Sequence, residues 1–174
     1  MDNMLDIIKA RRSCKSFKPD SIPMELVDKV VEAGLYAASG KNKQSPIVLA
    51  VTNKEIRDRL EALNAKYDAM GRKTPFYNAP VVLVVLAPKS FPTCVYDGSL
   101  VMGNMLLEAS TLGIGSCWIH RAKEAFEDPE GIEILRSLGI EEEYEGIGNC
   151  VLGYPEVQNT NILPRREGRV FHLD

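Results

Sequence analysis

The stretch "DGSLVMGNMLLEASTLGIGSCWI", residues 97–119, predicts a helix followed by a strand. Its first part, Asp97–Leu112, has the composition of a helix with only two charged residues. Such a helix is apolar on most sides and is expected at the centre of a fold. Gly113 and Gly115 then allow the backbone to pass close to a flat group, although a plain turn explains them equally well. Ile114–Ile119 is expected to be a short strand.

Helical and strand patterns continue on both sides of this stretch. Val81–Leu86 is continuously apolar, as expected for a strand buried on both faces. Elements of the two kinds alternate loosely, which indicates an α/β or α+β fold with helices packed on a sheet. Further helices are expected over residues 2–10, over Pro23–Ala38, after a cap at Asn53, and from Asp128-Pro129 to Gly139. The other expected strands cover residues 47–52 and 147–152.

Composition narrows the functional classes. The 174 residues fit a single domain over 1–174, with neither a linker nor a repeat. A net charge of −3 gives no bulk attraction to nucleic acid or an anionic membrane. We therefore expect no nucleic-acid or membrane partner, and MDNMLDIIKARR is not a signal peptide. Four scattered cysteines without a C-x-x-C pair argue against a disulfide framework or a zinc site, which favours a cytoplasmic location.

Two polar clusters lie in the N-terminal third of the chain. Arg11-Arg12-Ser13-Cys14-Lys15 could bind a phosphate through guanidinium and hydroxyl donors, or could simply form a basic helix end. "LYAASGKNKQSP", residues 35–46, contains a Gly-Lys pair but is not a triphosphate-binding loop, because its glycine spacing and its following asparagine do not match that motif. Its amides and hydroxyl suit a polar heterocycle, and the alternative is a plain helix-to-strand connection.

The remaining clusters lie at Trp118-Ile119-His120 and at Arg165-Arg166, which follows Gly153-Tyr154-Pro155. A turn and a solvated tail are the respective alternatives. The sequence contains no recognisable Ser/His/Asp order, carboxylate pair or metal-binding cluster. Several anion and heterocycle contacts without an acid–base set fit a cofactor that carries the chemistry itself.

Taken in this order, the clusters resemble the FMN-dependent nitroreductase family. "RRSCKSF" is similar to the family's N-terminal signature, and "AASGKNKQSP" to its Pro-Ser-x-x-Asn-x-Gln-Pro loop. "DGSLVMGNMLLEASTLGIGSCWI" and "GYPEVQNTNILPRR" are similar to its core helix with the following strand and to its Gly-Tyr-Pro segment with a terminal basic pair. The resemblance covers nearly the whole chain.

The resemblance implies an α+β nitroreductase-like fold, with a mostly antiparallel sheet flanked by helices and a C-terminal strand exchanged in a homodimer. The exchanged strand would be residues 168–173. The loop would reach a flavin bound mainly by the partner subunit, and Lys15 would lie at the pyrimidine edge of the isoalloxazine. The FMN-binding residues would be Arg11, Arg12, Ser13, Lys15, Ser39, Gly40, Asn42, Gln44, Trp118, Ile119, His120, Arg165 and Arg166.

The implied activity is an FMN-dependent oxidoreductase without catalytic side chains of its own or a metal. Hydride would pass from NADH or NADPH through FMN to a flat electron-poor acceptor (a nitroaromatic, quinone or enone) by a ping-pong mechanism. The alternative is a flavin-binding sensor or storage protein with negligible turnover. His120 and Arg121 stand where many members carry Glu-Gly or Gly, so the substrate-facing wall can differ. Arg72 and Lys73 match a further flavin ligand of some members too loosely to be assigned.

Overall fold

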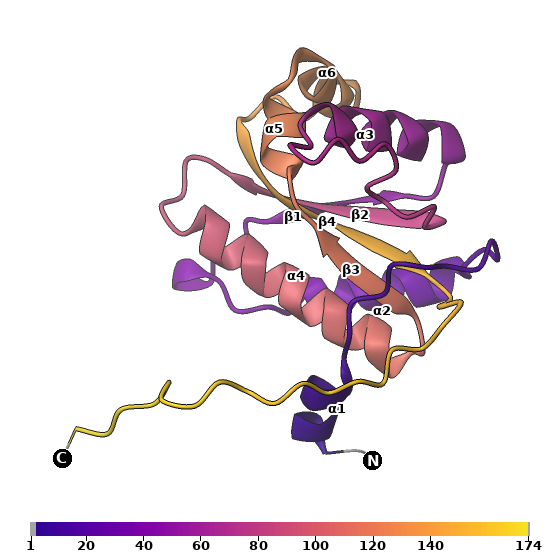
Figure 1. Ribbon diagram of the computed structural model, residues 1–174. Coiled ribbons are helices and arrows are strands. Elements are labelled where there is room, and N and C mark those ends of the chain that lie inside the picture. The colour runs from indigo at the N-terminus through magenta and orange to yellow at the C-terminus, as the bar shows by residue number, and fades with distance from the viewer. Residues whose placement is uncertain (1–2, 174) are drawn as a thin grey trace.

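The computed structural model describes residues 3–173, in which four strands form one sheet. The strand order is β1-β2-β4-β3, and all three pairings are antiparallel (Figure 1). The α+β fold with an antiparallel sheet is therefore confirmed. The strands are β1 (Ile47–Val51), β2 (Val81–Pro88), β3 (Gly115–Ile119) and β4 (Tyr144–Gly153).

Helices cover both faces of this sheet. In Figure 1, α3, α5 and α6 lie on one face, and α2 and α4 lie on the other. Residues of β2 alternate between the two layers, because successive side chains of a strand point to opposite faces. The helices are α1 (Met4–Ala10), α2 (Met24–Leu35), α3 (Lys54–Lys66), α4 (Cys94–Thr111), α5 (Ala122–Glu127) and α6 (Pro129–Ser137), with a 3₁₀ turn at Gly40–Asn42.

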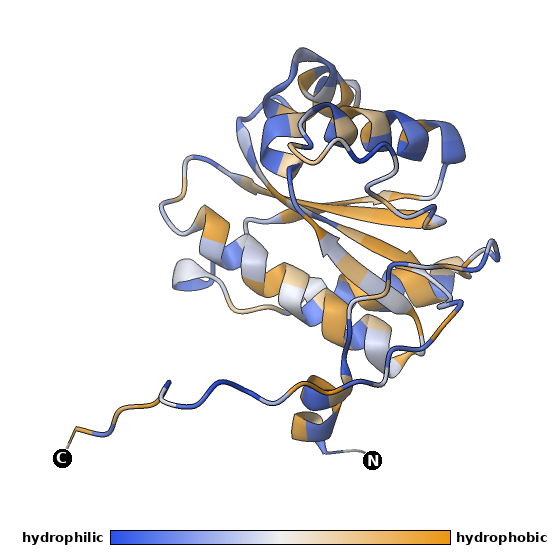
Figure 2. Ribbon diagram, viewed as in Figure 1, coloured by the Kyte–Doolittle hydropathy of each residue, from blue (hydrophilic) through white to orange (hydrophobic). Residues whose placement is uncertain are grey.

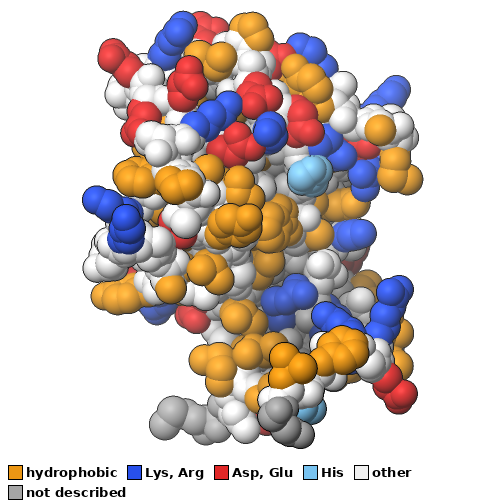
Figure 3. All heavy atoms as spheres, turned by 90° about the vertical axis from the view of Figure 1, so that its left-hand side faces the viewer, with side chains coloured by type: hydrophobic (Ala, Val, Ile, Leu, Met, Phe, Trp, Pro, Cys, Tyr) orange, Lys and Arg blue, Asp and Glu red, His pale blue; other side chains and the backbone are white. Residues whose placement is uncertain are grey.

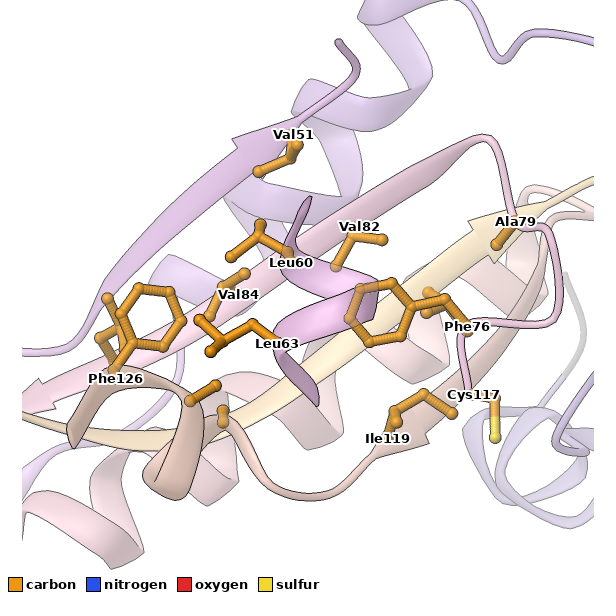
Figure 4. Close-up of a cluster of buried hydrophobic side chains, with 14 of the residues drawn as sticks. Val51, Leu60, Leu63, Phe76, Ala79, Val82, Val84, Cys117, Ile119 and Phe126 are labelled. Carbon is orange, nitrogen blue, oxygen red and sulfur yellow. The ribbon is translucent and has the colours of Figure 1, made fainter. Parts of the chain in front are cut away.

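Each layer has its own apolar core. Val82 and Val84 face the layer of α3 and α5, where they pack with Leu60, Leu63 and Phe126 (Figure 4). The alternate residues of β2 pack against α2 and α4. Every residue of β2 is buried, as its continuous apolar run predicts. Figure 2 shows mainly hydrophobic strands between helices that carry both hydrophilic and hydrophobic residues.

Several element boundaries differ from the sequence-based ones. The central helix α4 begins at Cys94, three residues before Asp97. Helix α2 ends at Leu35, before the expected Ala38, because the Ala37 N–H closes a tight turn on Gly34. Helix α5 was not expected, since six residues give too short a pattern to be recognised. The predicted cap at Asn53 and the predicted helix start at Asp128-Pro129 are confirmed, and the side chains of Asn53 and Asp128 each accept a backbone N–H.

Beyond β4 the chain leaves the folded body as an extended tail (Figure 1). Within residues 3–173 of a single chain, residues 168–173 pair with no strand. Val170 and Phe171 are 74% and 84% exposed, so this apolar segment has no cover in one chain. No helix of the described part has the length and apolar character needed to cross a membrane.

Candidate functional site

The basic segment Arg11–Lys15 is fixed against the start of β3. Ser13 forms a parallel bridge with Ser116, and the Cys14 N–H donates to the Ser116 carbonyl at 2.9 Å. A side chain at Gly115 would collide with Cys14, so glycine permits the close approach of the two segments. The basic segment therefore begins at the end of α1, where Arg11 is the C-cap, and is then held at the edge of the sheet.

The Arg12 guanidinium is held in place but is not fully paired. Its Nε donates to the Asn161 carbonyl at 2.8 Å, and one terminal nitrogen donates to the Arg11 carbonyl. The other terminal nitrogen, Nη2, is buried and has no hydrogen-bond partner in the described structure. A buried donor without a partner is costly, which makes this position receptive to an acceptor. Arg12 and Ser13 line a cavity of about 350 Å³ beside Gly113.

Groups of the basic segment influence the pKa of the Cys117 thiol. Burial raises the pKa of Cys117, while a hydrogen bond from Ser13 and the charges of Lys15 and Arg11 act to lower it. Arg11, Ser13 and Lys15 therefore each act on the same buried thiol of β3. The Lys15 Nζ also lies 5.9 Å from the centre of the Tyr77 ring. Sequence reasoning missed Tyr77, because no local pattern links it to the basic segment.

The loop Ser39–Gln44 is tightly organised. Its Gln44 N–H donates to Ser39 Oγ at 2.9 Å, and Gln44 Nε2 donates to Asn42 Oδ1 at 3.0 Å. Asn42 and Gln44 both have positive φ angles, which non-glycine residues adopt rarely. These internal hydrogen bonds hold the loop in a defined and strained shape.

The N-terminal end of α4 anchors this loop. Asp97 is buried and accepts the Gly40 N–H at 3.0 Å through Oδ1 and the Thr93 hydroxyl at 2.9 Å through Oδ2. A side chain at Gly40 would lie 2.5 Å from Thr93 Oγ1. Sequence analysis did not assign Thr93 or Asp97 to the site, although Asp97 is one of only two charges on an otherwise uncharged helix.

The two polar regions lie at opposite ends of α4 within one chain. The loop contacts its start at Asp97, whereas the cavity of the basic segment reaches its end at Ser110 and Gly113. Helix α4 has 18 residues, so its ends lie about 27 Å apart at 1.5 Å per residue. The structure therefore does not bring Ser39–Gln44 together with Arg11–Lys15 in a single chain.

The end of β3 carries the third cluster. Trp118 is 38% exposed although its strand neighbours are buried, and its indole lies against Gly148, where any side chain would collide. His120 is exposed, and Ile119 is buried between these two residues. The basic segment contacts β3 at Ser116, and the cluster at 118–120 lies at the end of the same strand.

Arg165 and Arg166 are exposed on the tail and do not join the basic segment in one chain. Arg72 and Arg121 both form ion pairs with Asp68. Sequence analysis did not identify Asp68. No group of metal-binding side chains occurs among residues 3–173.

Comparison with known proteins identifies the fold and the family. The model of the Nitroreductase family matches residues 8–154. A Methanothermobacter thermautotrophicus protein that carries the provisional name NADH dehydrogenase/NAD(P)H nitroreductase is 30% identical over 159 residues, covering 88% of this chain and 78% of its own. A Vibrio harveyi NADPH-flavin oxidoreductase is 24% identical, covering 98% of this chain and 72% of its own.

Solved structures give the same result. A nitroreductase from Bacteroides fragilis with bound FMN superposes with a TM-score of 0.86 at 29% identity, and the match covers all of both chains. A Desulfitobacterium hafniense nitroreductase with bound FMN gives a TM-score of 0.87 at 25% identity, also over all of both chains. The order of the clusters, the antiparallel sheet and these matches agree, and the chain belongs to the Nitroreductase family.

Proposed function

We propose that this protein is an FMN-dependent oxidoreductase that transfers electrons from NADH or NADPH to a flat electron-poor acceptor, such as a nitroaromatic, quinone or enone. The observation that carries the proposal is the buried Arg12 Nη2 without a partner, beside the cavity that Arg12 and Ser13 line. An anionic phosphate is the acceptor that suits a guanidinium best. The FMN-bound structures of family relatives support the same ligand.

The residues of β3 and the basic segment fit this cofactor. Arg11, Arg12 and Ser13 would hold the phosphate, and Trp118–His120 would line the isoalloxazine. Lys15 would lie at the pyrimidine edge, where its charge stabilises negative charge that develops on reduction. When bound, FMN supplies the redox chemistry by taking up a hydride and passing two electrons on. The protein contributes binding, orientation and electrostatics.

We propose further that two copies of the chain build each site. The loop Ser39–Gln44 contacts the start of α4, whereas the cavity of the basic segment reaches its end, so the loop would reach a flavin held by a partner copy. Exposed apolar residues on α4, including Tyr96 at 71% and Leu100 at 50%, support a homodimer. Figure 3 shows hydrophobic side chains gathered in the middle and lower parts of one face, below a charged upper part.

The C-terminal tail would also bind to the partner copy. Residues 168–173 would pair with the partner's sheet, and Arg165 and Arg166 would reach the partner's phosphate site. A strand without a pairing partner leaves its backbone groups to water, so the extended tail gains stability from such pairing. We place the reaction in the cytoplasm, because the four cysteines are free thiols.

Deleting residues 167–174 is expected to weaken dimerisation and FMN binding together, because a ligand that binds the assembled state stabilises it by mass action. Sedimentation velocity with flavin fluorescence measures both properties on the same sample. A truncated protein that stays dimeric and holds FMN as tightly as the full chain would show that the tail is a passive extension.

The proposed activity is tested by anaerobic stopped-flow spectroscopy of the protein as purified and after loading with FMN. NADH or NADPH should bleach the bound flavin rapidly, and steady-state double-reciprocal plots should run parallel because donor and acceptor take turns at one site. A protein that binds no FMN, or that releases FAD on denaturation, contradicts the cofactor. Bound FMN that neither nucleotide reduces would instead identify the flavin-binding sensor or storage protein.

A further inference from the structure

The corner after β3 has an unusual backbone. Arg121 has a φ of 76°, in the left-handed region that residues other than glycine adopt rarely, because the Cβ crowds the carbonyl. Such a conformation persists only where surrounding contacts hold it. The residue comes directly after His120, which belongs to the wall that the proposed function assigns to the flavin.

The Arg121 side chain is held by two groups of α3 and the turn that follows it. Its Nη2 lies 3.0 Å from Asp68 Oδ2 and donates to Asn64 Oδ1 at 3.2 Å. The Arg121 side chain is 12% exposed and that of Asp68 is fully buried. The hydrogen bond from Arg72, the Met70 N–H and the Arg121 charge hold the pKa of Asp68 below its ordinary value, so the carboxylate is ionised at neutral pH.

The same contacts reach the backbone of the corner. Asn64 Nδ2 donates to the His120 carbonyl at 2.8 Å, so this one buried amide holds both the side chain of Arg121 and the peptide that precedes it. Asn149 Nδ2 approaches the Ile119 carbonyl at 3.5 Å. The carbonyl groups of Ile119 and His120 are therefore both engaged by buried asparagines, and the interior of the protein fixes the orientation of these peptides.

We propose that Asp68 is a positioning residue that, through Arg121, holds the corner Ile119–Arg121 in its left-handed conformation and so orients the wall of the redox site. The second half of this proposal rests on the proposed function. A glycine at position 121 would take the same φ without strain and would need no such support. The ion pair is required because this chain carries arginine there.

The test is a double-mutant cycle of Asp68→Asn and Arg121→Gly, with Arg72→Gln as the matched control. Arg72→Gln removes the other cation from the same carboxylate, at 2.7 Å from Asp68 Oδ2, without touching the corner. Two readouts separate the two halves of the proposal. Amide hydrogen exchange over residues 117–125 is measured on the protein without flavin, and the reduction potential and hydride-transfer rate are measured on the FMN-loaded protein.

Asp68→Asn is expected to speed amide exchange at the corner about tenfold and to slow flavin reduction about tenfold, since small misplacements in a redox site reduce rate strongly. The bound flavin's potential should shift with the rate. In the Arg121→Gly background, Asp68→Asn should change each quantity less than about twofold. Arg72→Gln should leave exchange at the corner unchanged.

Additive effects of the two substitutions, or unchanged exchange in Asp68→Asn, would overturn the role of Asp68 at the corner. Coupled exchange with an unchanged potential and rate would overturn its role toward the flavin. A protein that binds no FMN would remove the proposed function and with it the second half of the proposal. The exchange measurements would still decide the first half, so the two failures are distinguishable.

Discussion

The basic segment Arg11–Lys15 and the loop Ser39–Gln44 are both polar, but they differ in whether their polar groups have hydrogen-bond partners. In the loop, Gln44 donates to Ser39 and Asn42, and the Gly40 N–H donates to Asp97. The basic segment leaves the buried Arg12 Nη2 without a partner and gathers Arg11 and Lys15 nearby. We therefore propose that the segment receives an anion, whereas the loop is already held in a defined shape by its hydrogen bonds.

This contrast matters because the basic segment and the loop lie apart in one chain. The two regions contact opposite ends of α4, a helix about 27 Å long, so the proposed anion site and the preformed loop of one chain do not meet. Two copies related by a two-fold axis would place the loop of each beside the anion site of the other.

Arg11→Ala should weaken FMN binding about ten- to a hundred-fold, because a charged contact to a phosphate contributes about 1.5–3 kcal/mol. Fluorescence titration of the unloaded protein measures the change. Lys9→Ala is the matched control, since Lys9 lies in the last turn of the same helix, α1, and is exposed. Equal losses in the two variants would mean that general charge, and not the basic segment, attracts the cofactor.

Lys15→Ala should mainly alter the flavin's redox behaviour. Loss of a positive charge near the reduced ring should lower the two-electron potential by about 20–40 mV, equivalent to about 1–2 kcal/mol. Spectroelectrochemistry measures the potential, with Lys18→Ala, an exposed lysine of the following turn, as the control. Identical potentials in the wild type and Lys15→Ala would remove Lys15 from the flavin edge.

Asp128→Asn should leave both regions untouched and change only stability. Hydrogen bonds from Lys66 and Tyr67 lower the pKa of Asp128 to about 2. Because this pKa is below that of the unfolded chain, about 3.9, the stabilisation is present above pH 4 and is lost as the pH falls toward 2. Urea unfolding between pH 2 and 6 should show a weaker acid dependence in the variant. Altered FMN affinity would contradict its assignment as a remote anchor.

The sequence predicted the fold well where periodicity is strong. The apolar run of β2 and the central helix α4, with only two charged residues, were recognised because each pattern is long. The predicted cap at Asn53 and the predicted helix start at Asp128-Pro129 were also correct. Helix α5, with six residues, gave no comparable signal.

The candidate site was predictable as a set of residues but not as an arrangement. The order of motifs pointed to Arg11–Lys15 and Ser39–Gln44, yet nothing in the sequence places them at opposite ends of α4. The Asp68–Arg121 pair joins residues far apart in the chain, and no local pattern predicts that Arg121 adopts a left-handed backbone conformation. Such contacts arise from tertiary packing, which local patterns do not encode.

The most direct test of the shared site is subunit complementation between Arg11→Ala and Gly40→Val. The first change disables the anion site, and the second displaces the loop, because a side chain at Gly40 would meet Thr93. Each variant alone should bind FMN poorly. After subunit exchange, random mixing should make about half of the dimers mixed, each with one site built from two intact halves, so about a quarter of the flavin sites should return. Failure to recover any tight FMN binding at any mixing ratio, with dimers confirmed by sedimentation, would show that each site is built within one chain.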